Sequence, residues 1–323
     1  MIVIAETAFN HEGDFDYLLR LIDAAADSGA DMIKFQVLIN ADEFVSHGAN
    51  SHGLITSWCF TLEQWQQALD RAESRGLRLF LMPLDTAAVA LCERPSVEFV
   101  EIHSVSFNDQ ALIDAVQALP KTLAFGIGGR TLEEVEYLVA TYGEDRLLLM
   151  HGFQAYPTDI EDVCFERINH LCQRFPGVRI GYADHSPPDS DESLEACLMA
   201  YARGLRIFEK HVTLEAERTD AQAGLLPQAM AHFVARMRRF HRLGNPDAAS
   251  WQPMTDAELV YRQRQKQVVA AEAIEAGQAF TRNNLMLCMH TSAGSHTRIS
   301  DLLGQSATSS YRSGEVIDEP AAD

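Results

Sequence analysis

Apolar residues gather in eight short runs along the first 212 residues, and each run is rich in Val, Ile, Leu and Phe. Between the runs, and after the last one, apolar positions recur at the spacing of a helix with one buried face. The runs are Ile2–Glu6, Met32–Val37, Arg78–Pro83, Phe99–Ser104, Thr122–Gly128, Leu147–Gly152, Arg179–Asp184 and Leu205–Val212. Helices are expected near residues 14–29, 61–75, 86–93, 108–118, 131–142, 160–175, 191–203 and 227–242. Strict alternation predicts a parallel sheet, because each parallel crossover needs a connection of this size. Eight such repeats predict a closed (β/α)8 TIM barrel.

Two of the expected helices begin with a capping-box pattern, in which a threonine is followed three residues later by Gln or Glu. These pairs are Thr61 with Gln64 and Thr131 with Glu134. The pattern predicts helices that start where the alternation of strands requires them.

A doubly wound sheet is the weaker alternative for this alternation. The segment Glu6-Thr7-Ala8-Phe9-Asn10 follows the first run, where a dinucleotide-binding fold has a glycine-rich turn. Gly126, Gly128 and Gly129 follow the fifth run. They indicate either a tight turn or a cradle for phosphate, and the sequence leaves both open.

The composition changes after Leu243. A polar stretch that includes Trp251-Gln252-Pro253 reads as a linker, and short strands and turns follow from about residue 264. The sequence therefore predicts a barrel domain over residues 1–243, a linker over 244–263 and a small β-rich domain over 264–323.

The overall charge narrows the partners. The chain of 323 residues is 47% hydrophobic and carries a formal charge of −20, which argues against nucleic acid and against an anionic membrane surface. The sequence has no apolar run of the roughly 18 residues that a membrane span needs. An anionic small substrate therefore needs a local cationic pocket or a metal. The six cysteines show no CxxC spacing, which indicates a reducing, cytoplasmic setting.

In a TIM barrel the working residues lie at the carboxyl ends of the strands. His185 and His211 follow the seventh and eighth runs, so neighbouring strands place two imidazoles near one divalent metal ion. His151 is a third candidate ligand. Asp184 and Glu209 are candidates to orient the two imidazoles.

Lys34 lies inside the second run, between Ile33 and Phe35, where an unpaired charge is costly. It must either pair with Glu6 or Glu209 or contact an anionic ligand. Glu6 ends the first run and is a candidate general base or the partner of that lysine.

Several segments, in order along the chain, together resemble the sialic acid synthase family. The matching segments are Ile4-Ala5-Glu6, Asn10-His11-Glu12-Gly13-Asp14, Lys34-Phe35-Gln36, Leu81-Met82-Pro83-Leu84-Asp85, His151 with Tyr156-Pro157, Gly181-Tyr182-Ala183-Asp184-His185-Ser186 and Phe208-Glu209-Lys210-His211-Val212-Thr213-Leu214. The tail from Val268 to Leu285 is similar to the antifreeze-protein-like (SAF) domain that ends these synthases. In this family that domain caps the barrel of the other subunit, which implies a domain-swapped homodimer.

The resemblance implies condensation of phosphoenolpyruvate with an N-acylated hexosamine, such as N-acetylmannosamine, to a nine-carbon 2-keto acid and phosphate. The implied cofactor is a divalent metal, Mn²⁺ first and Mg²⁺ or Co²⁺ as alternatives. By position, the implied catalytic residues are Glu6, Lys34 and His211, and the implied metal ligands are His185 and His211. For phosphoenolpyruvate, the implied binding residues are Lys34 and Lys121. For the sugar, they are Gln36, Tyr156, Glu134 and Asp220. Gln154 and Ser104 stand at further implied binding positions.

This chain departs from the family pattern mainly around the phosphate. The turn Gly126-Ile127-Gly128-Gly129 replaces a Ser-Thr-Gly-Met turn, and Glu101-Ile102-His103-Ser104 replaces a "KIAS" segment. Ala183 replaces a serine, and Met289 or His290 stands where the C-terminal domain carries an arginine, with Arg298 nearby. Two alternatives therefore remain: a metal-dependent barrel aldolase or isomerase, and a synthase-like protein that binds without catalysis.

Overall fold

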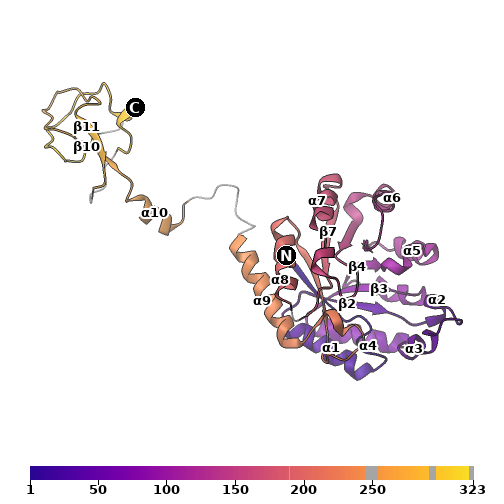
Figure 1. The fold of residues 1–323 in the computed structure, drawn as a ribbon. Coiled ribbons are helices and arrows are strands. Elements are labelled where there is room, and N and C mark those ends of the chain that lie inside the picture. Colours follow the sequence, from indigo (N-terminus) through magenta and orange to yellow (C-terminus); the bar gives the residue numbers. More distant parts are fainter. Residues whose placement is uncertain (189, 245–253, 291–295, 320–323) are drawn as a thin grey trace. The chain divides into compact units, whose positions relative to one another are not determined.

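The computed structural model describes residues 1–188, 190–244, 254–290 and 296–319. The chain divides into two compact units, Met1–Pro246 and Asp247–Asp323. Figure 1 shows the first unit from indigo to orange and the second in yellow. Each unit is described by itself.

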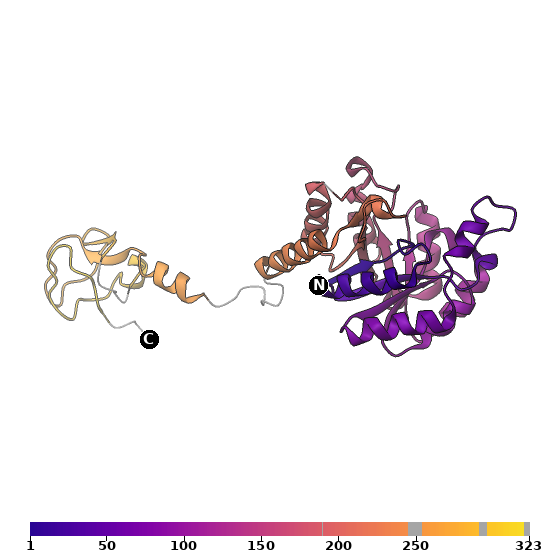
Figure 2. The ribbon, with the colours of Figure 1, turned by 90° about the horizontal axis from the view of Figure 1, so that it is seen from below.

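The first unit is a closed barrel of parallel strands (Figures 1 and 2). Its strands are β1 (Ile2–Glu6), β2 (Met32–Val37), β3 (Arg78–Pro83), β4 (Val97–Ile102), β5 (Thr122–Gly126), β6 (Leu147–His151), β7 (Arg179–Asp184) and β8 (Ile207–Val212). Each strand pairs with the next one in the sequence, and β1 also pairs with β8, which closes the barrel. A two-residue strand, β9 (Gly224–Leu225), pairs in parallel with the last two residues of β8, His211 and Val212. The predicted (β/α)8 barrel is confirmed.

Helices cover the outside of the barrel. They are α1 (Phe15–Asp27), α4 (Leu62–Ser74), α5 (Gln110–Gln117), α6 (Leu132–Tyr142), α7 (Phe165–Arg174), α8 (Asp191–Ala202) and α9 (Pro227–Gly244). The third crossover is the 3-10 helix Ala87–Glu93, and shorter 3-10 turns lie at Ser104–Ser106, Glu144–Arg146, Ile160–Asp162 and Ala221–Ala223. The capping boxes at Thr61 and Thr131 are both formed as predicted.

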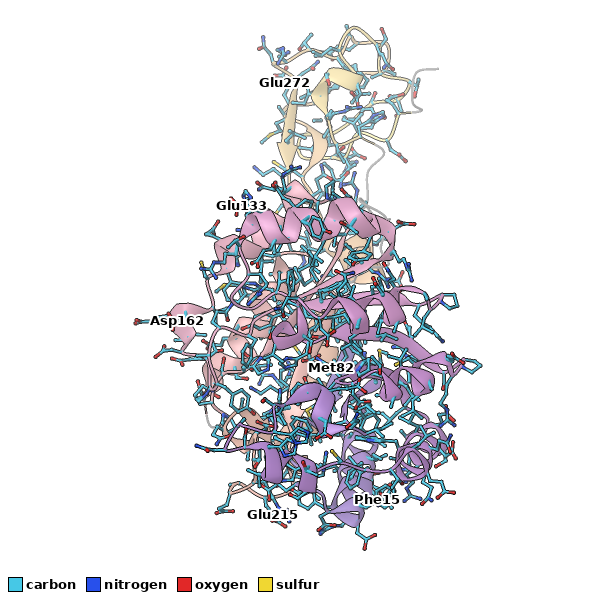
Figure 3. The ribbon with its side chains drawn as sticks, turned by 90° about the vertical axis from the view of Figure 1, so that its right-hand side faces the viewer. Phe15, Met82, Glu133, Asp162, Glu215 and Glu272 are labelled. Atoms are coloured by element: carbon cyan, nitrogen blue, oxygen red, sulfur yellow. The ribbon has the colours of Figure 1, made fainter. Side chains whose placement is uncertain are left out.

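The alternation of side chains along each strand separates two cores. In β1, Val3 and Ala5 pack outward against the helices, while Ile4 faces the barrel interior with Met32, Phe80 and others. The inner core consists of Ile4, Met32, Phe80, Phe99, Ala124, Leu148, Met150, Ala183 and Ile207. Buried Met82 of β3 lies near the middle of the barrel in Figure 3, and Asp162 and Glu215 lie at its edge.

The same two-residue period explains how polar residues reach the interior. Two positions beyond Ile4, Met32, Phe99 and Ile207 stand Glu6, Lys34, Glu101 and Glu209. These four therefore follow the inward register and lie next to the apolar inner core, on the side toward the carboxyl ends of the strands.

Two short helices between β2 and α4 were not expected from the sequence. They are α2 (Ala41–Phe44) and α3 (His52–Ser57), and both are too short to show a periodic apolar face. The Asp85 carboxylate accepts the backbone N–H of Ile39 and of Asn40, at 2.6 and 3.2 Å, and this contact fixes the start of the segment.

The second unit contains α10 (Asp256–Arg262) and an antiparallel pair of strands, β10 (Gln267–Ala270) and β11 (Leu285–Cys288). A 3-10 turn spans Ile299–Asp301. The core consists of Val268, Ala270, Ile274, Phe280, Leu285, Leu302, Ala307, Tyr311 and Ile317. Helix α10 lies inside the segment 244–263 that was predicted as a linker, and none of its residues is buried. The tripeptide Trp251-Gln252-Pro253, which was predicted as part of the same linker, lies outside the described residues. Among the described residues, no helix is long and apolar enough to cross a membrane.

Candidate active site

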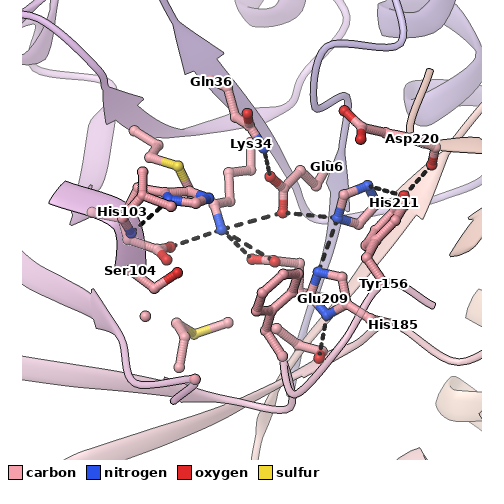
Figure 4. A pocket seen from close by; sticks show the side chains of 18 of the residues that line it. Glu6, Lys34, Gln36, His103, Ser104, Tyr156, His185, Glu209, His211 and Asp220 are labelled. Carbon is pink, nitrogen blue, oxygen red and sulfur yellow. Dashed lines mark hydrogen bonds and ion pairs between the residues drawn. The ribbon is translucent and has the colours of Figure 1, made fainter. Parts of the chain in front are cut away.

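A cavity of about 320 Å³ opens at the carboxyl ends of the barrel strands (Figure 4). Its lining comes from all eight strands or the loops that follow them. The lining residues are Glu6, Phe9, Lys34, Gln36, Phe44, Met82, Glu101, His103, Ser104, Val105, Gly126, Gly128, Met150, Phe153, Tyr156, Ala183, His185, Glu209, His211 and Asp220. The volume lies in the range of small-molecule sites.

Lys34 forms the centre of a buried charge cluster at the floor of this cavity. Its Nζ lies 2.8 Å from Glu101 Oε2, 3.0 Å from Glu209 Oε2 and 3.2 Å from Glu6 Oε2. All four side chains are at most 4% exposed. Among the described residues that line the cavity, Lys34 is the only lysine or arginine. Its charge is therefore already matched by carboxylates of the chain.

The cluster shifts the pKa values of its members in opposite directions. Burial opposes the charge of Lys34, but Glu101, Glu209 and Glu6 outweigh it and raise the lysine pKa, so the ammonium persists. Burial likewise opposes the charge of Glu6, but Lys34 and His211 hold the Glu6 pKa well below its usual value. Burial raises the pKa of Glu209 well above normal, and Lys34 offsets only part of that rise. Lys34 and His211 therefore favour the ionised form of Glu6, whereas burial favours the neutral form of Glu209.

His185 and His211 point toward each other, and their Nε2 atoms are 3.1 Å apart. The Nδ1–H of His185 donates to the carbonyl of Ala183 at 2.9 Å. The Tyr156 hydroxyl donates to the carbonyl of Asp220, so it can only accept from His211 Nδ1, which lies 3.4 Å away. Both imidazoles then carry their proton on Nδ1 and present a lone pair at Nε2.

This arrangement fits a divalent metal ion. Two facing lone pairs repel each other unless a cation lies between them, and neutral imidazole nitrogens are ligands that Mn²⁺, Co²⁺ and Zn²⁺ accept. Burial lowers the pKa of His185, and it lowers that of His211 to about 3, so both rings stay neutral. Glu6 Oε2 lies 3.5 Å from His211 Nε2 and adds a negative charge on the same side.

The residues expected to orient the imidazoles do not contact them. Asp184 faces outward and pairs with Lys210 at 2.5 Å, and Glu209 pairs with Lys34. The orienting groups are instead the Ala183 carbonyl and the Tyr156 hydroxyl. That part of the sequence interpretation is wrong for two reasons. Asp184 lies on the side of the sheet that faces away from the cavity. Glu209 faces the cavity, as His211 does, but its carboxyl group is paired with Lys34.

Most of the predicted substrate-binding residues meet in the cavity. Gln36 Nε2 donates to Glu6 Oε1 at 2.9 Å. The Asp220 carboxylate accepts the backbone N–H of Phe9 at 3.1 Å and lies beside Tyr156. Ser104 lines the same cavity.

Lys121 does not reach this cavity. It precedes the first residue of β5, and its Nζ donates to the carbonyls of Arg94 and Val97, at 2.7 and 2.8 Å. Val97 begins β4, so these contacts lie at the amino end of the barrel. The expectation that Lys121 contacts the substrate is therefore wrong.

Three further candidates lie outside the cavity lining. The Glu134 side chain caps the start of α6 by accepting the Thr131 N–H at 2.7 Å. His151 and Gln154 line a separate cavity between α6 and α7 and contact each other at 3.3 Å. His151 Nε2 also lies 3.1 Å from the carbonyl of Val163, so it is not a third ligand beside His185.

The glycine turn after β5 faces the cavity closely. A Cβ on Gly128 would lie 2.0 Å from the carbonyl oxygen of Phe153, and one on Gly126 would lie 3.2 Å from Glu101 Oε1. Gly128 is therefore required by the close approach of the β6 loop. This requirement explains the glycine without a phosphate ligand.

Sequence reasoning missed two kinds of lining residue. Glu101 was noted only as a replaced cation and not as a partner of Lys34, although its two-residue offset from Phe99 gave the signal. Phe44 lies on the unexpected helix α2, and Phe9 on the loop after β1. Of the two phenylalanines, only Phe9 follows a strand end, which could have marked it in the sequence.

The closed barrel and its cavity of carboxylates and facing imidazoles define a TIM-barrel protein with an enzyme-like site at the carboxyl ends of its strands. Residues 21–247 match the NeuB family, and the chain belongs to that family. The resemblance to sialic acid synthases is thereby confirmed, and the protein is a synthase-type enzyme.

The relatives are distant in sequence but close in length and fold. The chain is 25% identical over 340 residues to N,N'-diacetyllegionaminic acid synthase of Campylobacter jejuni, covering 98% of this chain and 99% of that protein. It resembles the structure of spore coat polysaccharide biosynthesis protein E from Chromobacterium violaceum, with 25% identity, 99% of each chain covered and a TM-score of 0.81. It also resembles the N-acetylneuraminic acid synthetase of Leptospira borgpetersenii in complex with citrate, with 26% identity, 81% and 90% coverage and a TM-score of 0.71.

Proposed function

We propose that the barrel cavity condenses phosphoenolpyruvate and water with the open-chain form of an N-acylated hexosamine, giving a nine-carbon 2-keto acid and phosphate. The observation that carries the proposal is the pair of facing, neutral Nε2 atoms of His185 and His211 beside an ionised carboxylate. Relatives that are named sugar-acid synthases support the same reaction class.

His185 and His211 would hold the divalent ion, Mn²⁺ first, which supplies Lewis-acid polarisation of the sugar aldehyde. The sugar would lie between the histidines and the Gln36, Tyr156 and Asp220 side. These side chains offer an amide, a hydroxyl and a carboxylate, which suit the hydroxyl and acylamino groups of a hexosamine.

In this proposal Glu6 accepts a proton from the water that adds to the carbon derived from phosphoenolpyruvate. Lys34 and His211 lower the pKa of Glu6, which favours its ionised form. Gln36 at 2.9 Å and Lys34 at 3.2 Å fix its orientation before substrate binds. The enol phosphate would lie toward Ser104 and the backbone N–H groups of the Gly126–Gly129 turn. Backbone donors can hold phosphate without a hydroxyl side chain.

The test is phosphate release from phosphoenolpyruvate with a panel of N-acylated hexosamines, with Mn²⁺ and after chelation. Turnover with one sugar that requires the metal and disappears in His185→Ala is the expected result. Measurable Mn²⁺ binding without turnover on any sugar would contradict the condensation.

A second candidate function follows from Glu101. Its carboxylate lies 2.8 Å from Lys34 Nζ, at the position where the synthase pattern has a lysine, so the cavity lacks a free cation for phosphate. This favours a metal-dependent aldolase or isomerase acting on the carbonyl of a sugar without phosphoenolpyruvate. The phosphate-release assay separates the two, since only the condensation liberates phosphate.

We also propose a cytoplasmic homodimer in which the second unit, as an antifreeze-protein-like domain, caps the barrel of the other subunit. All six cysteines are free, which suits a reducing compartment. Light scattering of the purified chain tests the dimer, and a monomeric mass would contradict it.

A further inference from the structure

Three side chains with metal-binding atoms meet on the loop between β2 and α4, outside the barrel cavity. Asp42 lies on α2, His52 begins α3, and His47 lies on the turn that joins them. Asp42 Oδ1 is 2.8 Å from His52 Nε2 and 3.4 Å from His47 Nε2. The three ligand atoms all lie within 4.8 Å of one another.

We propose that Asp42, His47 and His52 bind a second divalent transition-metal ion, of the Zn²⁺ class, independently of the barrel cavity. Bond lengths of about 2.0–2.2 Å at a tetrahedral ion separate its ligand atoms by roughly 3.3–3.5 Å. The separation of 3.4 Å between Asp42 Oδ1 and His47 Nε2 lies in this range. The separation of 2.8 Å between Asp42 Oδ1 and His52 Nε2 is about half an ångström shorter, so these two side chains would move apart by that amount around an ion.

The donor set selects the kind of ion. Two imidazole nitrogens and one carboxylate oxygen suit Zn²⁺, Co²⁺ or Cu²⁺ better than Ca²⁺ or Mg²⁺, which prefer oxygen ligands. The side chains of His47 and Asp42 are 74% and 52% exposed, so water can complete the coordination. His52 is only 20% exposed and is the most fixed of the three.

The loop that carries the ligands is anchored independently of a metal. Phe9, Trp58 and neighbouring apolar side chains form a small cluster against which Phe44 and Ile55 pack. Asn40 caps α2 by accepting the Asp42 N–H at 3.2 Å. The backbone near Asp42 and His52 is therefore anchored by the fold, and the ion has to order mainly the exposed side chain of His47.

The ion would connect α2 to α3 at the edge of the barrel mouth. Phe44 follows Asp42 by two residues and lines the barrel cavity. Occupation of the site is therefore expected to hold the segment 42–57 and to protect it from proteolysis.

The test measures zinc content of the full chain, after chelator treatment, by competition with a chromophoric chelator. The wild-type chain is expected to bind two equivalents of Zn²⁺. His47→Gln and the near-isosteric Asp42→Asn should each bind one, and His185→Ala should lose the other. His232→Gln, an exposed histidine on α9, is the matched control and should bind two.

The proposal is overturned if His47→Gln and Asp42→Asn bind as much zinc as wild type and His232→Gln. Co²⁺ provides a second measurement, because four-coordinate Co²⁺ absorbs visible light. The His47 and Asp42 variants should lose the absorption of Co²⁺ bound at the loop site. His185→Ala should keep that absorption. Circular dichroism checks that each variant is folded. Since metal content is measured rather than turnover, failure of this site leaves the proposed condensation untouched.

Discussion

Glu101 is the residue that most alters the charge of the cavity. Its carboxylate lies 2.8 Å from Lys34 Nζ and repels an anionic substrate at the same place. We expect Glu101→Gln to bind phosphoenolpyruvate at least about tenfold more tightly than wild type, which corresponds to about 1.4 kcal/mol. Calorimetric titration with phosphoenolpyruvate measures the change. Glu98→Gln, on the same strand but paired with exposed Arg78, is the control, and equal affinities of the two variants would contradict the prediction.

Protonation of His11 makes the stability of the barrel depend on pH. Burial lowers its pKa from 6.5 to about 4, its Nδ1 accepts the Gly13 N–H at 3.0 Å, and its ring packs against Trp65. Because the folded pKa is the lower one, the unfolded chain takes up the proton first, and stability falls as the pH drops from about 6.5 toward 4. The full effect of this one group is about 3 kcal/mol.

In His11→Gln the side chain stays neutral and can still accept the Gly13 N–H. Between pH 7 and pH 4.5 we therefore expect the free energy of unfolding of this variant to fall by about 2 kcal/mol less than that of wild type. Urea unfolding followed by tryptophan fluorescence measures both. The exposed His232→Gln serves as control. An unchanged pH slope in His11→Gln would show that His11 is not neutral in the folded protein.

The residues also show where sequence reasoning works. Lys34 had to be paired because it lies in an apolar strand, and Glu6 and Glu209 were rightly named as partners. The prediction that Lys121 contacts the substrate is wrong because Lys121 precedes Thr122, the first residue of β5. It therefore lies at the amino end of the barrel, away from the cavity. The predicted start of that strand already contained this information.

At the scale of elements, a buried ion pair joins β7 to β8 next to His185 and His211. Lys210 Nζ contacts Asp184 Oδ2 at 2.5 Å with both side chains fully buried, and Asp184 also accepts from Ser186 and Ser193 at 2.7 Å. His185 and His211 each follow one member of this pair. Asp184 and Lys210 are partners in the β7–β8 register, so the ion pair reinforces the pairing that places the two imidazoles opposite each other.

Removing one member of this pair should leave a buried, unmatched charge. We expect Lys210→Met to lower the free energy of unfolding by about 3–5 kcal/mol, while Asp184→Asn with Lys210→Met recovers much of it. Urea unfolding measures the stability, and zinc competition measures the metal affinity at His185 and His211. If the double variant is as unstable as the single one, the charge imbalance is not the cause.

The elements that the sequence could not predict share a physical reason. The strands and long helices repeat an apolar period over many residues, whereas α2 and α3 are held by tertiary contacts such as the Asp85 carboxylate with Ile39 and Asn40. Helix α10 begins with a capping box at Thr255 but has no buried residue, so its apolar pattern gives no signal.

At the scale of the whole molecule, closure of the barrel creates the site. Glu6 and His211 are register partners only because β1 pairs with β8. Local patterns predict the strands, but which side chains meet across the closure depends on register. This is why the two histidines were found from strand ends while the contacts of Glu101 were not.

The two units have separate hydrophobic cores, so damage to one should leave the other folded. Phe280 is 1% exposed in the second unit. Phe280→Ala should lower the free energy of unfolding of this unit by about 3–5 kcal/mol, which is most of the stability that so small a core provides. Zinc binding at His185 and His211 should persist, because those residues belong to the barrel.

If the second unit caps the partner's barrel, phosphate release should fall at least about tenfold in the same variant. Met286→Ala, at a 43% exposed position of β11, is the control and should retain both. Full activity in an unfolded second unit, shown by loss of its calorimetric transition, would remove that unit from the catalytic assembly.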